Sequence, residues 1–111
     1  MNLNVGEVDG VTVIETTGRL DTATAPELER AGGELIDAGV IRIVLDLSRL
    51  EYLSSAGLRV ILALAKRLRA AEGELVMCEA GGLVRETLEL AGIVGIVPLC
   101  ATLDDALGGS A

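Results

Sequence analysis

The chain has 111 residues, and half of them are apolar, which is enough for one domain with its own hydrophobic core. Its net charge of −8 argues against binding to a nucleic acid backbone or to an anionic membrane surface. Tyr52 is its one aromatic residue, so it lacks the stacking platform that single-stranded nucleic acids require. The chain has no histidine, which excludes Ser-His-Asp and Cys-His nucleophile systems.

Two cysteines, Cys78 and Cys100, each stand in an apolar run. Such residues usually serve as small buried side chains in a reducing compartment, which leaves a disulfide between them as the less favoured alternative. Without histidine they are too few for a metal site, so no metal is expected. The first ten residues do not resemble a signal peptide, and the longest apolar run, residues 60–65, is too short to cross a bilayer. We expect a cytoplasmic monomer that does not bind a membrane.

The first third of the chain predicts a hairpin followed by a helix. Two short apolar strands are separated by Asp9-Gly10, residue types that tolerate the positive φ of a tight turn. Residues 18–21 are predicted to form a loop. Thr24 and Glu27 have the spacing of a capping box at the start of a helix, and Gly39 is a suitable stop.

The rest of the chain alternates between strands and helices. A central strand is predicted over residues 41–47, because both of its faces are apolar apart from Arg42 and Asp46. The later predicted elements are a helix over about 56–71, a strand over 75–78, a helix after Gly81-Gly82, a strand over 93–99, a helix from Thr102 to Leu107 and a flexible tail over 108–111. This alternation predicts one α/β domain over residues 1–111, with a mixed, mostly parallel sheet.

The most informative local feature is a pair of serines, Ser54 and Ser55, at the predicted start of the long helix. Serine favours the N-cap, and replacing such a cap by alanine costs about 1 kcal/mol. The unpaired N–H groups of a helix start also tolerate negative charge, so a hydroxyl there is well placed to carry a phosphate. Spacing alone favours capping, but the two roles are compatible, because one serine can cap while its neighbour stays exposed.

Other candidates for chemistry are weak. The serines lack the Gly-x-Ser-x-Gly context of a nucleophile elbow, and the one lysine, Lys66, stands too far along the helix to activate them. Gly81-Gly82 more often forms a tight turn than an anion site. Asp21, in the predicted loop, is as consistent with loop organisation as with a functional role. We therefore expect no enzymatic activity and no cofactor.

Two segments together resemble a known family. VLDLSRLEYLSSAGLRVILALAKRL, residues 44–68, is similar to the signature of the STAS domain, specifically that of the stand-alone anti-sigma factor antagonists. GRLDTATAPELE, residues 18–29, resembles the loop and first helix of the same family. The resemblance implies a compact α/β domain with a mixed sheet of four to five strands and about four helices packed largely on one face. It also implies an unmodified protein that binds an anti-sigma factor and so releases a sigma factor.

In this family the anti-sigma factor is often a serine kinase that phosphorylates the antagonist at the helix start, and a serine phosphatase removes the phosphate. Carried over to this chain, the acceptor is Ser55; Ser54, which stands where the family commonly has aspartate, is the rival site. The implied partner-binding residues are Asp21, Leu53, Ser54, Ser55, Gly57, Leu58 and Arg59, although core packing is the favoured role for Leu53 and Leu58. Two alternatives stay open: an unphosphorylated STAS scaffold or subunit of a transporter-associated or signalling complex, and a nucleotide-binding domain.

Overall fold

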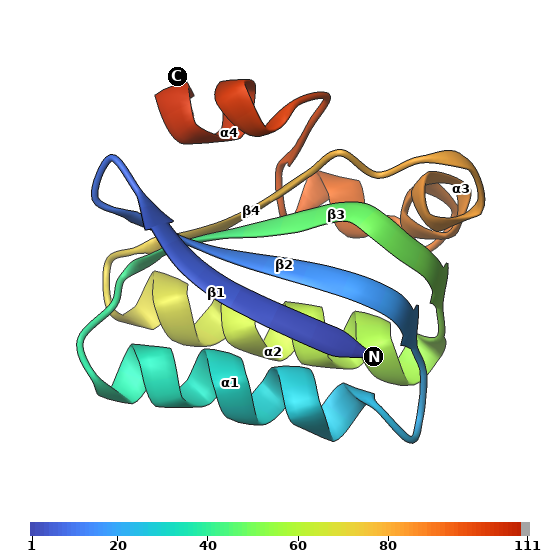
Figure 1. The fold of residues 1–111 in the computed structure, drawn as a ribbon, viewed down its shortest axis with the longest axis horizontal. Coiled ribbons are helices and arrows are strands. Elements are labelled where there is room, and N and C mark those ends of the chain that lie inside the picture. Colours follow the sequence, from blue (N-terminus) through green and yellow to red (C-terminus); the bar gives the residue numbers. More distant parts are fainter. Residues whose placement is uncertain (110–111) are drawn as a thin grey trace.

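The computed structural model describes residues 1–109, in which a five-stranded sheet is covered by four helices (Figure 1). The elements in chain order are β1 (Asn2–Val8), β2 (Val11–Leu20), α1 (Ala25–Asp37), β3 (Arg42–Leu53), α2 (Ser55–Ala70), β4 (Glu74–Cys78), α3 (Gly82–Leu90), the 3-10 turn η1 (Ile93–Gly95), β5 (Leu99–Cys100) and α4 (Leu103–Gly109). Of the predicted tail, residues 108–109 belong to α4, and residues 110–111 lie outside the described residues.

The strands follow one another across the sheet in the order β1-β2-β3-β4-β5. β1 and β2 are antiparallel and meet at the predicted turn, where Asp9 and Gly10 have φ values of 52° and 81°. The other three pairs of neighbouring strands are parallel. The prediction of a mixed, mostly parallel sheet is therefore confirmed.

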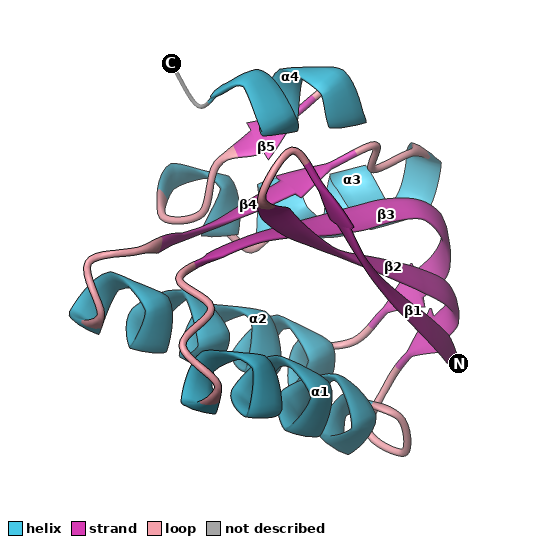
Figure 2. Cartoon of the chain, turned by 60° about the vertical axis from the view of Figure 1, so that its left-hand side comes forward, coloured by secondary structure: helices cyan, strands magenta, loops and turns pink. Residues whose placement is uncertain are grey.

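Most of the helical packing lies on one face of the sheet, and α4 lies on the other (Figures 1 and 2). One core joins alternate residues of the strands to the buried sides of α1, α2 and α3; its members include Ile14, Ile43, Leu45, Leu75 and Met77 from the sheet and Leu28, Ile61 and Leu88 from the helices. The intervening strand residues form a smaller core with Ala106 of α4; they include Val13, Val44, Val76 and Cys78. The central strand β3 is thus covered on both faces, as its apolar sequence predicts.

Two strands run further than predicted. β2 continues through the expected loop to Leu20, and β3 extends to Leu53 instead of ending at residue 47. Leu20 and Leu53 are paired in the parallel ladder, and the backbone N–H of Ser54 donates to the Leu20 carbonyl oxygen at 2.9 Å. The additional pairing brings the two segments that follow these strands to the same edge of the sheet.

The strand predicted over residues 93–99 is wrong. Ile93–Gly95 form a 3-10 turn after Gly92, whose φ of 72° reverses the chain, and the short strand β5 pairs with β4 only from Leu99. Ile93 and Val97 are 2% and 0% exposed, so they fill the core from a turn. A short apolar run has the same composition whether it forms a strand or a buried turn, so the pattern alone could not distinguish the two.

Candidate functional site

The carboxyl ends of β2 and β3 bring the predicted site residues together. Asp21 directly follows Leu20, and Ser54 directly follows its ladder partner Leu53. From this edge the chain enters α1 after β2 and α2 after β3, so both helices begin here (Figure 1). Two motifs that are more than thirty residues apart in the sequence therefore share one end of the molecule.

Of the two serines that the sequence places at the helix start, Ser54 is the N-cap of α2. Its backbone is extended, with φ −96° and ψ 173°, and its Oγ accepts a hydrogen bond from the N–H of Gly57 at 3.3 Å. Its carbonyl oxygen accepts the first helical hydrogen bond, from Leu58 at 3.0 Å. The Ser54 side chain is only half-buried, but its hydroxyl is engaged in the structure of the helix.

Ser55 is the first residue of α2, and it is exposed. Arg59, also exposed, follows four residues later, so the two side chains lie on the same face of the helix. Negative charge at this point is favoured by the partial positive charge of the helix start and by the guanidinium one turn away. The start of α2 therefore favours negative charge at this position.

Asp21 organises the loop that leads into α1. Its Oδ1 accepts hydrogen bonds from the backbone N–H groups of Ala23 and Thr24, both at 3.1 Å. The backbone hydrogen bond from Thr24 is the main reason that the pKa of Asp21 is lowered; burial opposes the shift, while the Thr24 hydroxyl, Ala23 and the guanidinium of Arg19 add to it. The sequence left open whether Asp21 organises the loop or has a functional role, and its hydrogen bonds in the structure organise the loop.

The capping box predicted for α1 is wrong. Thr24 is the N-cap, but its side chain makes no capping hydrogen bond to the helix. Its Oγ1 instead donates to the carbonyl oxygen of Arg19 at 2.7 Å and accepts from the N–H of Asp21 at 2.9 Å. The Thr24 hydroxyl bonds to the loop because the hydrogen bonds of Asp21 hold the loop backbone close to it.

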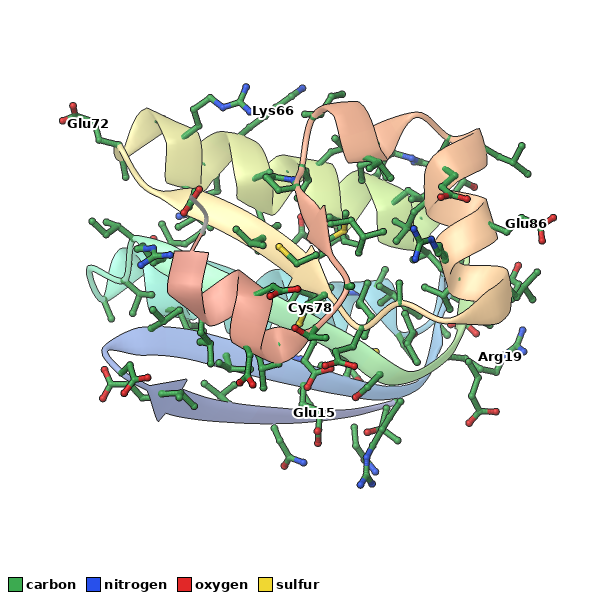
Figure 3. All side chains as sticks on the ribbon, turned by 90° about the horizontal axis from the view of Figure 1, so that it is seen from above. Glu15, Arg19, Lys66, Glu72, Cys78 and Glu86 are labelled. Carbon is green, nitrogen blue, oxygen red and sulfur yellow. The ribbon has the colours of Figure 1, made fainter. Side chains whose placement is uncertain are left out.

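Arg19 and Tyr52 form a part of this surface that the sequence analysis missed. Gly18, with φ 98°, lies next to a shift in the register between β2 and β3, after which Arg19 stands opposite Tyr52. The Arg19 guanidinium lies 4.2 Å from the centre of the Tyr52 ring. The side chain of Arg19, which is labelled in Figure 3, is 62% exposed. Nε of Arg19 also lies 3.7 Å from Oδ2 of Asp21. A bulge marked by glycine is a weak signal in a sequence, because it depends on pairing with a distant strand.

Three other predicted site residues lie beneath the surface or at its margin. Leu53 is 3% exposed, and Gly57 is buried against it. A Cβ at Gly57 would lie 2.7 Å from Cγ of Leu20 and 2.8 Å from Cδ1 of Leu53, so only glycine fits there without rearrangement. Leu58 is half-buried and packs against the main core. These residues position the start of α2, whereas Ser55 and Arg59 face outwards.

A shallow groove of about 430 Å³ runs between the amino-terminal halves of α1 and α2, and Ala56, the neighbour of Ser55, lines it. Most of the side chains that line it are small and apolar, and two carry opposite charges; the lining residues are Thr22, Ala25, Pro26, Glu29, Ala56, Arg59, Val60 and Ala63. The groove offers a partner an apolar floor next to the exposed serine.

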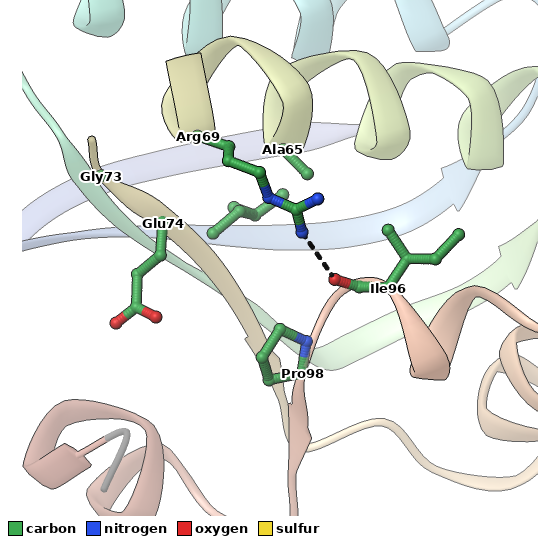
Figure 4. Close-up of a pocket in the computed structure, with 7 residues that line it drawn as sticks. Ala65, Arg69, Gly73, Glu74, Ile96 and Pro98 are labelled. Atoms are coloured by element: carbon green, nitrogen blue, oxygen red, sulfur yellow. Dashed lines mark hydrogen bonds between the residues drawn. The ribbon is translucent and has the colours of Figure 1, made fainter. Parts of the chain in front are cut away.

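A second pocket, of about 270 Å³, lies at the other end of α2 (Figure 4). There Arg69 donates a hydrogen bond to the carbonyl oxygen of Ile96 at 3.3 Å. Arg69 is fourteen residues from Ser55, which is about 21 Å along a helix. This pocket is therefore separate from the serine surface.

Two further features bear on the kind of site. Within residues 1–109, no three His, Cys, Asp or Glu side chains are arranged to hold a metal ion. In the same part of the chain, no helix has the length and apolar character needed to span a bilayer.

Known proteins resemble this chain over nearly its whole length. The family model of the STAS domain matches residues 2–106. A putative anti-sigma factor antagonist of Bordetella bronchiseptica, BtrV, is 42% identical over 106 residues, which cover 96% of this chain and 91% of that protein. The crystal structure of an anti-sigma factor antagonist from Mycobacterium paratuberculosis has a TM-score of 0.89 and 36% identity, covering 96% of this chain and 90% of the other.

A Bacillus cell fate determinant, SpoIIAA, solved in its phosphorylated form, shares the fold, with a TM-score of 0.75 and coverage of 96% of each chain, at only 21% identity. Family membership depends instead on the match to the STAS model and on the nearer relatives. The match to the family model and the similarity to these relatives show that the chain belongs to the STAS domain family, among the anti-sigma factor antagonists.

Proposed function

We propose that the unmodified protein binds an anti-sigma factor with serine kinase activity, so that a sigma factor is released, and that phosphorylation of Ser55 ends this binding. One observation carries the proposal: Ser55 is exposed at the first position of α2, while the hydroxyl of Ser54 is engaged in the cap. The names of the relatives support an anti-sigma factor as the partner. The phosphorylated structure of SpoIIAA is a precedent for a phosphate on this fold.

The geometry favours Ser55 over Ser54 as the acceptor. A kinase must bring the hydroxyl oxygen to the γ-phosphate of ATP, and an exposed side chain can reach it without rearrangement. Ser54 is half-buried, and transfer to its Oγ would first break the hydrogen bond from Gly57. The phosphate on Ser55 would lie near open N–H groups of the helix start and one turn from Arg59, so the fold persists after modification.

The proposed switch needs only a change of charge in a contact surface. A phosphate adds about −1.5 to −2 charges at pH 7. Ser55 directly precedes Ala56, which lines the apolar groove, and a partner bound there would exclude water, so an added dianion would be costly. A loss of 3 kcal/mol weakens binding by more than about a hundredfold. Arg19, next to Asp21, extends this surface and is available to a carboxylate of the partner.

The chain itself performs no catalysis in this scheme. The anti-sigma factor transfers the phosphoryl group, a serine phosphatase removes it, and this protein presents the hydroxyl. Asp21, Ser54 and Leu58 shape the surface, whereas Leu53 and Gly57 support it from below. We place the exchange in the cytoplasm, with one copy of this chain as the binding unit.

The test starts with co-purification of the protein from its native cells, which identifies the anti-sigma factor. The two proteins are then incubated with ATP, and the phosphorylated residue is mapped by mass spectrometry in wild type, Ser55→Ala and the matched control Ser54→Ala. We expect phosphate on wild type and on Ser54→Ala, but not on Ser55→Ala. Ser55→Asp should bind the anti-sigma factor at least tenfold more weakly than wild type.

Stoichiometric modification of Ser55→Ala would show that another residue is the acceptor. Binding of Ser55→Asp with the affinity of wild type would instead favour the alternative of a scaffold that works without phosphorylation.

A further inference from the structure

The two cysteines stand opposite each other on neighbouring strands, although they are 22 positions apart in the sequence. Cys78 is the last residue of β4, Cys100 is the last residue of β5, and the two are paired in the parallel ladder. Hydrogen bonds on either side secure this register: Met77 N–H to the Pro98 oxygen at 2.8 Å, and Glu79 N–H to the Cys100 oxygen at 3.3 Å. Both residues belong to the small core beneath α4 (Figure 3 labels Cys78).

This arrangement meets the main requirement for a disulfide. Neighbouring strands are about 4.8 Å apart. The Cα atoms of bonded cysteines are usually about 4.4–6.8 Å apart. Paired residues of a parallel ladder point to the same face, so the two sulfur atoms lie on the same side of the sheet. Because β5 contains only two residues and stands at the edge of the sheet, it can adjust more easily than a central strand.

We propose that Cys78 and Cys100 form a reversible intramolecular disulfide when the protein meets a hydroperoxide. The pair is free in the structure, which represents the reduced state. This proposal is independent of the proposed function of Ser55, because the cysteines lie on β4 and β5, whereas Ser55 begins α2 after β3.

The environments of the two thiols differ, and this gives them different roles. Cys78 is 0% exposed, and burial, followed by the charges of Asp46 and Glu79 and by Cys100, raises its pKa to about 12. It therefore stays protonated and does not react with an oxidant directly. Cys100 is partly exposed, so a hydroperoxide reaches it first.

The chemistry proceeds in two balanced steps. The Cys100 sulfur takes the terminal oxygen of the hydroperoxide, whose O–O bond breaks, giving a sulfenic acid and releasing an alcohol, or water when the oxidant is hydrogen peroxide. The Cys78 sulfur, giving up its proton, then attacks the Cys100 sulfur; the S–S bond forms, the S–O bond breaks, and the oxygen leaves as water. A dithiol reductant reverses the reaction.

The disulfide would fasten the carboxyl-terminal part of the chain to the sheet. It closes a loop that contains α3 and η1, and it anchors β5, which otherwise adds only two residues to the sheet. α4 follows β5 directly and packs over the same two cysteines. For a loop of this length we expect the midpoint of thermal unfolding to rise by on the order of 10 °C on oxidation.

The test uses the purified chain and hydrogen peroxide. After treatment, the protein is denatured with an alkylating reagent, its mass is measured, and its oligomeric state is checked by non-reducing electrophoresis. We expect a monomer that has lost two hydrogen atoms, has no thiol left to alkylate and unfolds at a higher temperature, with all three changes reversed by dithiothreitol. Cys100→Ser, a change at a partly exposed position, should fold but show no such rise.

Other products would overturn the inference. Two alkylatable thiols after treatment would show that the pair does not react. Disulfide-linked dimers alone, or a sulfinic acid at Cys100 with Cys78 still free, would show that Cys78 does not capture the sulfenic acid.

Discussion

Ser54 and Ser55 provide the sharpest test of how this site is built, because the structure gives adjacent, identical residues different roles. Replacing Ser54 by alanine removes the oxygen that accepts the Gly57 N–H at the start of α2. Replacing Ser55 removes an exposed hydroxyl from the first helical position. Ser54→Ala should therefore lower the stability of the fold, whereas Ser55→Ala should affect only the proposed modification.

The expected loss of stability in Ser54→Ala follows from the geometry of the cap. Loss of a serine N-cap costs about 0.5–2 kcal/mol. The distance from Gly57 N to Ser54 Oγ is 3.3 Å, which is long for a hydrogen bond of this type, so we expect the lower half of that range. A loss of about 1 kcal/mol would lower the unfolding midpoint by roughly 4–6 °C in a domain of this size. For Ser55→Ala, an exposed substitution to a better helix former, we expect a change within about 0.5 kcal/mol of zero.

The assay is urea unfolding followed by far-ultraviolet circular dichroism, with the urea midpoint compared among wild type, Ser54→Ala and Ser55→Ala. The slope of the transition should be the same in all three, because neither change alters the surface exposed on unfolding. If Ser55→Ala is destabilised more than Ser54→Ala, the hydroxyl of Ser55 is the one that stabilises the helix, and Ser55 is not the free acceptor.

Three further predictions test the surrounding structure. In α1, Gly32→Ala should destabilise the fold by about 1–2 kcal/mol, because its Cβ would lie 2.7 Å from the buried side chain of Leu64. The Cβ of the matched control Gly33→Ala would lie 3.0 Å from the exposed Nη1 of Arg67, and this variant should be neutral or stabilising in the same urea experiment. Because the pKa of Asp21 is lowered in the folded protein, its carboxylate stabilises the fold at pH values above 3.8, the ordinary pKa. This contribution is lost as the pH falls through the lower pKa of the folded state. The difference in unfolding free energy between wild type and Asp21→Asn should therefore narrow below about pH 4. Arg19→Ala should change the near-ultraviolet dichroism of the one aromatic ring and cost about 0.5–1 kcal/mol; an unchanged spectrum would show that the guanidinium does not stack on the ring in solution.

Local chemistry made much of the fold predictable. The Asp9-Gly10 turn, a serine cap at the start of α2 and the stop at Gly39, with φ 99°, each depend on what a few neighbouring residues permit. The helix predicted to begin at Thr102 is also confirmed: α4 starts at Leu103, and Thr102 Oγ1 accepts the N–H of Asp105 at 3.1 Å. Such features survive folding because tertiary contacts reinforce them.

Both failures involve competing contacts that lie outside the predicted pattern. The spacing of Thr24 and Glu27 suits a capping box, but the loop around Asp21 offers the Thr24 hydroxyl better partners. Residues 93–99 are apolar enough for a strand, yet the core is filled by side chains from a turn. In both places the local preference was real and was outweighed by packing or hydrogen bonding that a linear pattern does not contain.

The sequence by itself determined the alternation of strands and helices, the start of α2 at a serine pair and the absence of histidine chemistry, because periodicity, capping and composition are local properties. Only the tertiary structure decided that Ser54 is the cap and Ser55 the exposed neighbour, that Arg19 stacks on Tyr52, and that Cys78 meets Cys100. The last two contacts depend on strand register across 33 and 22 positions of sequence. Register is set by the packing of the whole sheet, and a shift of one residue would turn these side chains to the other face.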